Sequence, residues 1–242
     1  VADERSVWFD GGSIENCGND MHGPYYGTDG FFYWCKGAFA PQQHQLANGR
    51  TRTSRAAHVY RALPDGSQLE RVITGGMNNP VGLAFSTTGE RFLSGTFFDL
   101  SAPGRRDGVL HAVYGGIYGR KNPRVLAPHP ATGDLLPVLS HLGPAAPSGI
   151  VMPHSSATGL DGDLICTEFN TRRLSRHQLS QVGSSFESKV STFIESDQAD
   201  FHPTDVIEDA DGSLLVADTG SWYKICCPTS KIAKPDILGA IY

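Results

Sequence analysis

Polar and titratable residues recur in this chain where apolar runs begin. His22 follows Asp20 closely, Asn79 precedes a Pro-Val-Gly-Leu run, and His202 opens a His-Pro-Thr-Asp segment that also contains Thr204 and Asp205. A histidine titrates near neutral pH and can take a proton from a substrate hydroxyl. The sequence therefore offers His22, together with Asp20, as a candidate general base, provided that these segments meet in the folded chain.

Each polar segment introduces the same local pattern, which is clearest over residues 202–220. A short apolar run at Val206-Ile207 is followed by the turn Asp209-Ala210-Asp211-Gly212 and by a second apolar run over 213–217. Aspartate and glycine tolerate the backbone conformations of tight turns, so the pattern predicts a β-hairpin. Similar patterns start near residues 22, 79 and 147. Repeated all-β units of this kind predict the blades of a β-propeller.

The predicted fold is one all-β domain over residues 1–242, built of four-stranded antiparallel blades. We place four blades at approximately 22–73, 79–140, 147–194 and 202–242 and expect the propeller to be incomplete at its N-terminus. An open propeller exposes strand edges. In a propeller the inner strand of each blade lines a central channel, so the polar segments would converge at one mouth of that channel and form a concave site.

Several elements inside the blades can be predicted. The pattern predicts a hairpin over residues 58–62 and 69–73, joined by a Pro-Asp-Gly-Ser turn, and blade core at the aromatic run 31–34. Residues 173–179 are predicted to form a third strand. The polar segment 39–55 is predicted to be a loop, and the proline-rich segment 123–137 a loop or an edge.

Composition excludes some classes of protein. The chain has 242 residues, 28 glycines, 15 prolines and a formal net charge of −5, with no basic run, so a nucleic-acid-binding footprint is absent. No apolar stretch approaches the ~18 residues of a membrane-spanning helix. Residues 1–5 lack the pattern of a signal peptide, which predicts a mature terminus or a chain cut at its front.

The five cysteines lack the spacing of a zinc ribbon or of a haem attachment motif. The adjacent Cys226 and Cys227 would be buried thiols or, in an oxidising compartment, a vicinal disulfide.

A group of residues carries a resemblance to a known family. Six segments carry this resemblance: residues 30–39, 104–108, 114–119, 202–205, 222–224 and 226–230. They resemble the membrane-bound dehydrogenase domain of Planctomycetes and Verrucomicrobia, and the resemblance covers nearly the whole chain. The resemblance implies an exported, periplasmic protein that associates with a membrane through other parts of the full protein. It also implies a cytochrome c module or another electron acceptor as partner.

The layout is similar, more distantly, to the soluble glucose and sorbosone dehydrogenases. These are six-bladed propellers that use pyrroloquinoline quinone (PQQ) and calcium, so the chain would be part of a six-bladed propeller. The resemblance implies that His22 is the general base, that Asn79 contacts the cofactor, and that the backbone around Pro103 binds calcium. A calcium ion held by carbonyls and by Asp107 or Asp20 is chemically plausible.

The chain departs from this family at its cationic residues. Asn78 stands where the family has an arginine before the asparagine, Asn170 or the nearby Arg172 and Arg173 replace a lysine, and His202 and Thr204 replace two arginines. PQQ carries three carboxylates, whose burial requires compensating charge. We nevertheless place His202, Thr204 and Asp205 with Asn79 as candidate cofactor contacts. Further candidates for an anionic ligand are Lys36, Arg105 and Arg106, although a solvated turn is the simpler interpretation of the two arginines.

Alternatives remain for these residues. The His-Pro-Thr-Asp segment can be purely structural if Thr204 or Asp205 binds exposed backbone groups at the start of a strand. Trp222 and Tyr223 would stack on a sugar or pack between blades. The other histidines are expected to be surface or packing residues; they are His44, His58, His111, His129, His141, His154 and His177.

The sequence and the resemblance lead to two hypotheses for the function. The first is an exported sugar or alcohol dehydrogenase of the aldose type, in which His22 acts as base and electrons pass to a quinone or cytochrome partner. The second is a non-catalytic propeller that binds carbohydrate or protein, since fold does not imply function.

Overall fold

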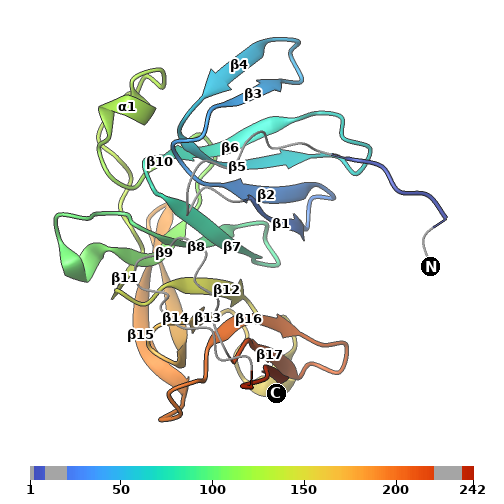
Figure 1. Cartoon of the computed structure of the whole chain (residues 1–242), viewed down its shortest axis with the longest axis vertical. Coiled ribbons are helices and arrows are strands. Elements are labelled where there is room, and N and C mark those ends of the chain that lie inside the picture. Colours follow the sequence, from blue (N-terminus) through green and yellow to red (C-terminus); the bar gives the residue numbers. More distant parts are fainter. Residues whose placement is uncertain (1–2, 9–20, 221–235) are drawn as a thin grey trace.

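The computed structural model describes residues 3–8, 21–220 and 236–242, and strands dominate this part of the chain. Four sheets follow one another along the sequence, and in Figure 1 they fan out from their first strands. Sheet 1 has the order β1-β2-β5-β6-β10, sheet 2 the order β11-β9-β8-β7, sheet 3 the order β12-β13-β14-β15, and sheet 4 the order β16-β17-β18. This arrangement confirms the predicted all-β propeller architecture.

The strands of sheets 1 and 2 and the separate β3–β4 pair have the following bounds: β1 Met21–Tyr26, β2 Phe32–Lys36, β3 Gln42–Gln45, β4 Thr51–Ser54, β5 Ala57–Ala62, β6 Glu70–Gly75, β7 Asn79–Phe85, β8 Arg91–Thr96, β9 Asp107–His111, β10 Ile117–Tyr118 and β11 Ser140–Gly143. Those of sheets 3 and 4 are β12 Pro147–Val151, β13 Leu164–Glu168, β14 Arg173–Val182, β15 Ser185–Glu195, β16 Pro203–Glu208, β17 Leu214–Asp218 and β18 Ala240–Ile241. The described helices are short: α1 Pro123–Leu126 and the 3-10 helices Pro103–Arg105 and Ser156–Thr158.

The hydrophobic core lies between consecutive sheets rather than inside one layer. Tyr33 and Val59 of sheet 1 pack with Leu93 of sheet 2, and two further clusters join sheet 2 to sheet 3 and sheet 3 to sheet 4. The second strand of each of the first three sheets therefore has neighbours on both faces. This explains why β2, β8 and β13 are almost continuously buried instead of alternating.

Glycine closes the turn between the first and second strands of each sheet. Gly30, Gly89, Gly162 and Gly212 all have φ between 80° and 89°, in the left-handed region. Glycine adopts this conformation without the steric penalty of a Cβ. The turn residues that predicted the hairpins are thus the residues that form them.

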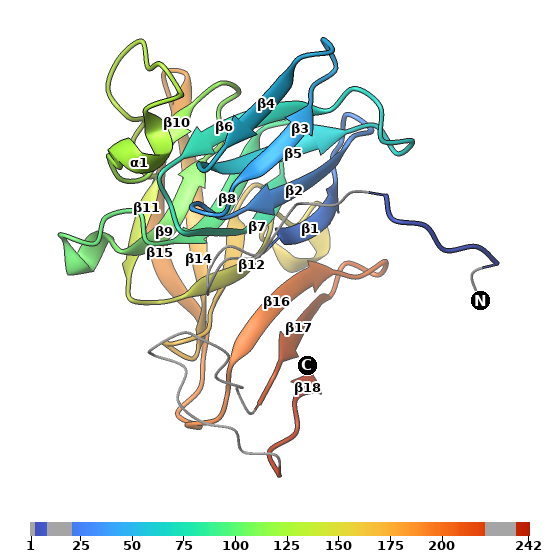
Figure 2. The same ribbon diagram turned by 45° about the horizontal axis from the view of Figure 1, so that its top comes forward.

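The predicted hairpin 58–62/69–73 corresponds to β5 and β6, and the predicted strand 173–179 lies within β14. The prediction for residues 39–55 is wrong in one respect. The segment contains the hairpin β3–β4, with Gln42 opposite Ser54, and Figure 2 shows this hairpin beside β5 and β6. Polar residues misled the prediction because this hairpin buries polar side chains, including Gln42 and His44.

The connection between β9 and β11 returns to sheet 1. In this connection β10 pairs in parallel with β6, with Ile117 opposite Thr74 and Tyr118 opposite Gly75. The chain then passes through α1, inside the predicted loop 123–137, before β11 completes sheet 2. Sheets 1 and 2 are therefore joined by backbone pairing as well as by their apolar core.

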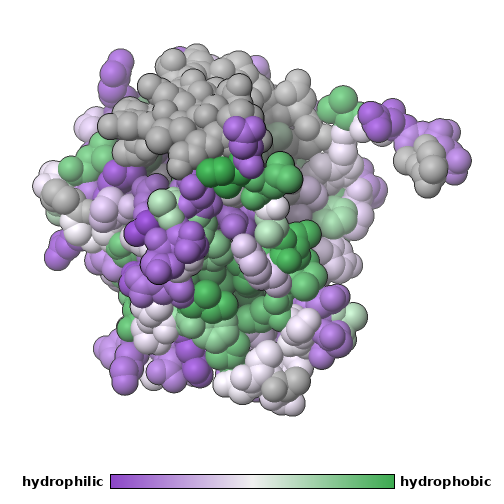
Figure 3. All heavy atoms as spheres, turned by 60° about the horizontal axis from the view of Figure 1, so that its bottom comes forward, coloured by the Kyte–Doolittle hydropathy of each residue, from purple (hydrophilic) through white to green (hydrophobic). Residues whose placement is uncertain are grey.

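Figure 3 shows hydrophobic side chains gathered in the middle of one face of the molecule, with hydrophilic side chains around them. Within the described residues, no helix is long and apolar enough to cross a membrane.

Candidate active site at the first strands

The first strands of the four sheets lie side by side. β1 packs beside β7, β7 beside β12, and β12 beside β16. Each first strand has a shift in register near its start; the shifts fall between His22 and Tyr25, Pro80 and Leu83, Pro147 and Ile150, and Pro203 and Asp205. Irregularities of this kind redirect side chains and are frequent beside functional sites. The polar segments that precede these four strands therefore lie in one region of the molecule, where the first strands meet.

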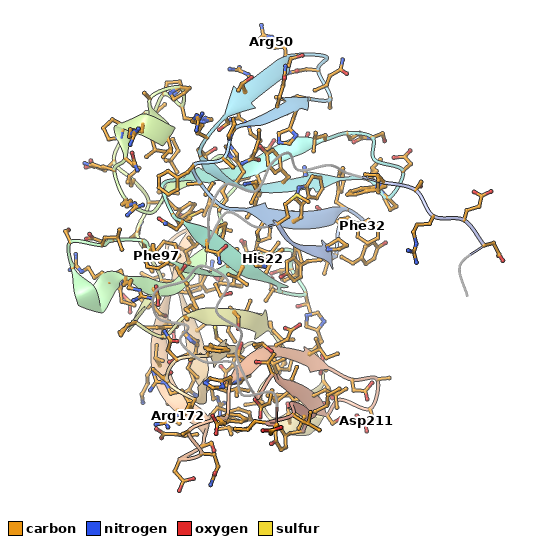
Figure 4. All side chains as sticks on the ribbon, in the orientation of Figure 1. His22, Phe32, Arg50, Phe97, Arg172 and Asp211 are labelled. Carbon is orange, nitrogen blue, oxygen red and sulfur yellow. The ribbon has the colours of Figure 1, made fainter. Side chains whose placement is uncertain are left out.

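His22 and Asn79 are brought together by the contact between β1 and β7. The half-buried His22 has its Nε2 3.1 Å from Asn79 Oδ1. An amide oxygen only accepts hydrogen bonds, so the ring donates from Nε2 and carries its lone pair on Nδ1. Figure 4 shows His22 near the centre of the fan of sheets. This pair has the geometry of a histidine whose tautomer is fixed by a second residue.

A cavity of about 410 Å³ opens beside His22. Its lining is mostly apolar and aromatic and includes Trp8, Phe32 and Trp34. Trp8 is fixed there, since its Nε1 donates to Pro64 O at 2.9 Å and its ring meets Trp34 edge-on at 5.3 Å. A space of this size matches the usual dimensions of a small-molecule site, and His22 is the titratable residue among its described lining.

Asp205 lies on β16, close to Tyr25 of β1. The residue as a whole is exposed, but its Oδ1 accepts from the N–H of Val206 at 2.9 Å and lies against Gly149. The partial burial of this carboxyl raises the pKa of Asp205. Burial, Cys35 and then Asp205 raise the pKa of the Tyr25 hydroxyl, which donates to Val81 O at 2.8 Å. First strands from three sheets therefore contribute to this region.

His202 and Thr204 make local contacts at the entrance to β16. The imidazole of His202 stacks on Phe169 with ring centroids 4.5 Å apart, and its Nδ1 bonds to Gly220 O. Thr204 Oγ1 donates to Ala217 O at 3.3 Å. These contacts are of the structural kind considered for this segment. Their role as cofactor contacts stays a prediction.

The predicted calcium segment lies in the outer part of sheet 2. Pro103 begins a 3-10 helix, in which Arg105 N donates to Ala102 O at 2.7 Å. Asp107 is fully buried and accepts backbone N–H groups from Ala146 at 2.8 Å and Phe97 at 3.3 Å. Burial raises the pKa of Asp107. The carboxylate thus joins sheet 2 to the start of sheet 3, and its role as a calcium ligand stays a prediction.

No group of three or more His, Cys, Asp or Glu side chains within the described ranges could hold a metal ion. The catalytic candidate Asp20, the residues Trp222 and Tyr223, and the pair Cys226-Cys227 lie outside the described residues. Of the described cysteines, Cys35 and Cys166 are free and buried.

Most of the other histidines form buried contacts, as expected for packing residues. His58 is fully buried with Nε2 2.7 Å from Ser54 Oγ, and burial lowers its pKa well below the ordinary value. His177 is fully buried between Ser140 and Ser175 at 3.1 and 3.0 Å, and burial lowers its pKa to about 4. These rings stay neutral at pH 7 and lie in the packing between elements.

The sequence did not single out Arg120. Its Nη2 donates to Asn78 Oδ1 at 2.6 Å, directly beside the residue that contacts His22. The two residues are 42 positions apart, and only the return of the chain at β10 brings them together. A Gly-Arg pair after a strand is too weak a signal to predict this contact.

Three solved structures are similar in fold. An oxidoreductase of Thermus thermophilus assigned as a glucose dehydrogenase is 22% identical, with a TM-score of 0.54 over 80% of this chain and 57% of that one. The PQQ-bound aldose sugar dehydrogenase of Streptomyces coelicolor is 18% identical, with a TM-score of 0.58 over 89% and 59%. A further glucose dehydrogenase is 15% identical, with a TM-score of 0.60 over 88% and 64%.

No protein-family model matches the chain, and no curated protein matches it in sequence. The chain spans 57% to 64% of these three solved structures. The likeness establishes the fold: the molecule is a partial β-propeller like those of the soluble sugar dehydrogenases.

Proposed function

We propose that this chain belongs to an exported sugar or alcohol dehydrogenase of the aldose type, with His22 as its general base. The observation that carries the proposal is that His22, whose Nε2 contacts Asn79, lines a cavity of about 410 Å³. The propeller shared with sugar dehydrogenases supports it. The aromatic lining of the cavity would receive the apolar face of a sugar ring, and the imidazole would meet a hydroxyl.

In the proposed step, the substrate hydroxyl loses its proton to Nδ1 of His22 while its carbon loses hydride to a two-electron acceptor. Asn79 keeps the proton of the resting imidazole on Nε2, so the lone pair remains on the nitrogen that must accept. General-base catalysis of this kind contributes about 10² to 10⁴ in rate. The aromatic lining would limit the access of water to the transferred hydride.

PQQ is the proposed cofactor and would supply the two-electron acceptor when bound. The described lining of the cavity beside His22 is mostly apolar and contains no lysine or arginine, so it does not supply the positive charge that the three carboxylates of PQQ require. Asn79, His202, Thr204 and Asp205 are the residues that would contact the cofactor, with calcium near Pro103 or Asp107. A cytochrome c domain or another acceptor would take the electrons.

We also propose a periplasmic or otherwise exported location, with membrane association through other parts of the full protein. The resemblance to the Planctomycetes and Verrucomicrobia domain is the basis for this proposal.

The test is reconstitution of the chain with PQQ and calcium, followed by dye-linked oxidation of a panel of aldoses and alcohols. We expect His22→Ala to lower kcat by about 10² to 10⁴. The matched control is His141→Ala, which removes an exposed histidine on the outer strand β11. Equal rates for the His22 and His141 variants would remove His22 from the mechanism.

The alternative is a non-catalytic propeller that binds carbohydrate or protein. The local, structural contacts of His202 and Thr204 favour it, because those positions hold no arginine toward a cofactor. Absence of turnover with every substrate, combined with saturable sugar binding in the same cavity, would establish this alternative.

A further inference from the structure

Strand β15 presents a long open edge. It pairs with β14 on one side, and no strand among the described residues pairs with its other side. With 11 residues it is the longest of the described strands, and most of its residues are exposed. Figure 1 shows β15 (orange) on the outer side of β14. Such an edge carries unpaired N–H and C=O groups that can bind another strand.

The outermost strands of the other sheets are short. They are β10 in sheet 1 with two residues, β11 in sheet 2 with four, and β18 in sheet 4 with two. β15 contains no proline, and its register against β14 is unbroken from Ser185 to Thr192. Short length, proline and bulges are the usual protections of an edge, so β15 has only its charged side chains for this purpose.

The hairpin turn fixes which backbone groups of β15 point outward. The two-residue turn Gly183-Ser184 joins β14 to β15, with Val182 opposite Ser185. The pair that flanks a two-residue turn is hydrogen-bonded, so the backbone groups of Ser185 face β14. Bonded and non-bonded pairs then alternate along the antiparallel ladder. The residues whose backbone groups face the open edge are therefore Phe186, Ser188, Val190 and Thr192.

Contacts with sheet 2 and within sheet 3 hold this part of β15 in place. Ser185 Oγ lies 3.1 Å from His111 Nδ1, and the ring of Phe186 meets that of His111 edge-on at 5.1 Å. Ser188 Oγ lies 3.3 Å from Nδ1 of the buried His177. An edge that is already fixed in its extended conformation loses little conformational entropy when another strand pairs with it.

The charges on β15 are complementary about Ser188. Glu187 and Lys189 flank this residue, and both are exposed. When a second copy of β15 pairs antiparallel with Ser188 opposite Ser188, each Glu187 lies opposite the Lys189 of the other copy. In the same register Phe186 lies opposite Val190. Because Ser188 faces the open edge, Glu187 and Lys189 form the non-hydrogen-bonded pairs, whose side chains are closest, and opposite charges there stabilise the ladder.

We propose that two copies of this chain associate through their β15 strands, paired antiparallel about a two-fold axis at Ser188. The association is closed, since each copy uses its one long edge and the same residues serve both copies. It joins the two copies of sheet 3 into one continuous sheet. The contact is small, so we expect a weak dimer with a Kd in the micromolar range. The inference does not depend on the proposed dehydrogenase activity.

The experiment is sedimentation equilibrium of the 242-residue chain over a range of concentrations, together with the variants Glu187→Lys and Lys189→Glu. Each variant alone places like charges opposite each other and should weaken the Kd of the dimer by about tenfold or more. An equimolar mixture of the two variants should regain the dimer, because an acidic strand then faces a basic one. The double variant should regain it too, since its charges are exchanged but still opposite. Both side chains are exposed, so the fold should be kept.

A backbone variant tests the hydrogen bonds across the two-fold axis. Val190→Pro removes an N–H that faces the open edge and leaves the bonds to β14 in place. Thr192→Pro is the matched control, because it removes the next edge-facing N–H, which lies opposite the turn residue Ser184 of the other copy and outside the proposed ladder. We expect dimerisation to be lost with Val190→Pro and kept with Thr192→Pro. Circular dichroism checks that both variants are folded.

Three results would count against the proposal. A wild-type chain that stays monomeric at every concentration would overturn it. A dimer that persists in Val190→Pro and in both charge variants would show that the copies meet through another surface. A dimer that the charge variants weaken and their mixture does not restore would rule out the register centred on Ser188. Oxidation of sugars is measured separately, so the proposed function stands or falls independently of these results.

Discussion

At the scale of single residues, the candidate base differs from many catalytic histidines in the charge of its described partner. Asn79 is neutral, so it fixes the ring through Nε2 without stabilising the imidazolium. A carboxylate at this place would favour the protonated ring. The contact with Asn79 therefore fixes the ring tautomer of His22 and adds no charge beside it.

Asn79→Asp tests this reasoning. The new carboxylate would lie about 3.1 Å from Nε2 and would raise the pKa of His22 by about one unit or more. Because the base must be neutral to act, the acidic limb of the kcat/KM profile should move to higher pH by the same amount. The measurement is the pH profile of the reconstituted chain, and an unchanged acidic limb would contradict the Asn79 contact.

At the scale of elements, the repeated irregularity in the first strands depends on small residues. Gly82 of β7 and Gly149 of β12 occupy corresponding places in these irregularities. A Cβ on Gly82 would overlap Ser148 O, and a Cβ on Gly149 would overlap Asp205 and approach Val206 N. Each glycine thus permits the next first strand to come close, which is what assembles the site from separate sheets.

Gly149→Ala should lower the free energy of unfolding by about 1 to 3 kcal/mol, because the overlap with β16 forces the backbone to shift. Gly133→Ala is the control, since a Cβ there meets no atom within 4 Å and its effect should be within about 0.5 kcal/mol. Denaturant unfolding of both variants measures the difference. Equal stabilities would show that the first strands can separate without cost.

At the scale of the whole molecule, polar side chains join the sheets inside apolar packing. His177 on β14 of sheet 3 contacts Ser140 on β11 of sheet 2, at 3.1 Å. His58 and His129 meet the same Ser54 hydroxyl at 2.7 and 2.9 Å, which ties sheet 1 to the β3–β4 hairpin and to the segment after α1. Buried neutral imidazoles in such places make the assembly sensitive to acid.

The protein should lose stability as the pH falls below about 6.5. Unfolded His177 protonates near its ordinary pKa of 6.5, whereas in the folded protein its pKa is lowered to about 4. Protons therefore bind preferentially to the unfolded chain between these values, and the loss from this residue approaches about 3 kcal/mol near pH 4. His58 and His129, whose pKa values are also lowered by burial, act in the same direction.

Unfolding measured from about pH 7.5 to about pH 4.5 checks this prediction. The variant His177→Gln should show a shallower dependence on pH, and His154→Gln, at an exposed position, should match wild type. The prediction would be wrong if stability rose as the pH fell through this range.

The sequence by itself determined the repeated unit of this fold. Strand, turn and strand are contiguous, and the glycines of the turns occupy the backbone conformation that only glycine adopts without penalty, as at Gly89 and Gly212. Polar residues at the start of each unit then predicted where a site would form. These features are local, so an ordered pattern of residue types is enough to reveal them.

Tertiary structure alone decided which of these residues meet. His22 and Asn79 are 57 positions apart, and Arg120 and Asn78 are 42 apart. Their contacts depend on how separate sheets pack and on the return of β10 to sheet 1, neither of which leaves a periodic pattern in the sequence. The polar hairpin β3–β4 was missed for the same reason, because its side chains are buried by elements distant along the chain. Packing between sheets is a property of shape and volume, and one sequence records it only indirectly.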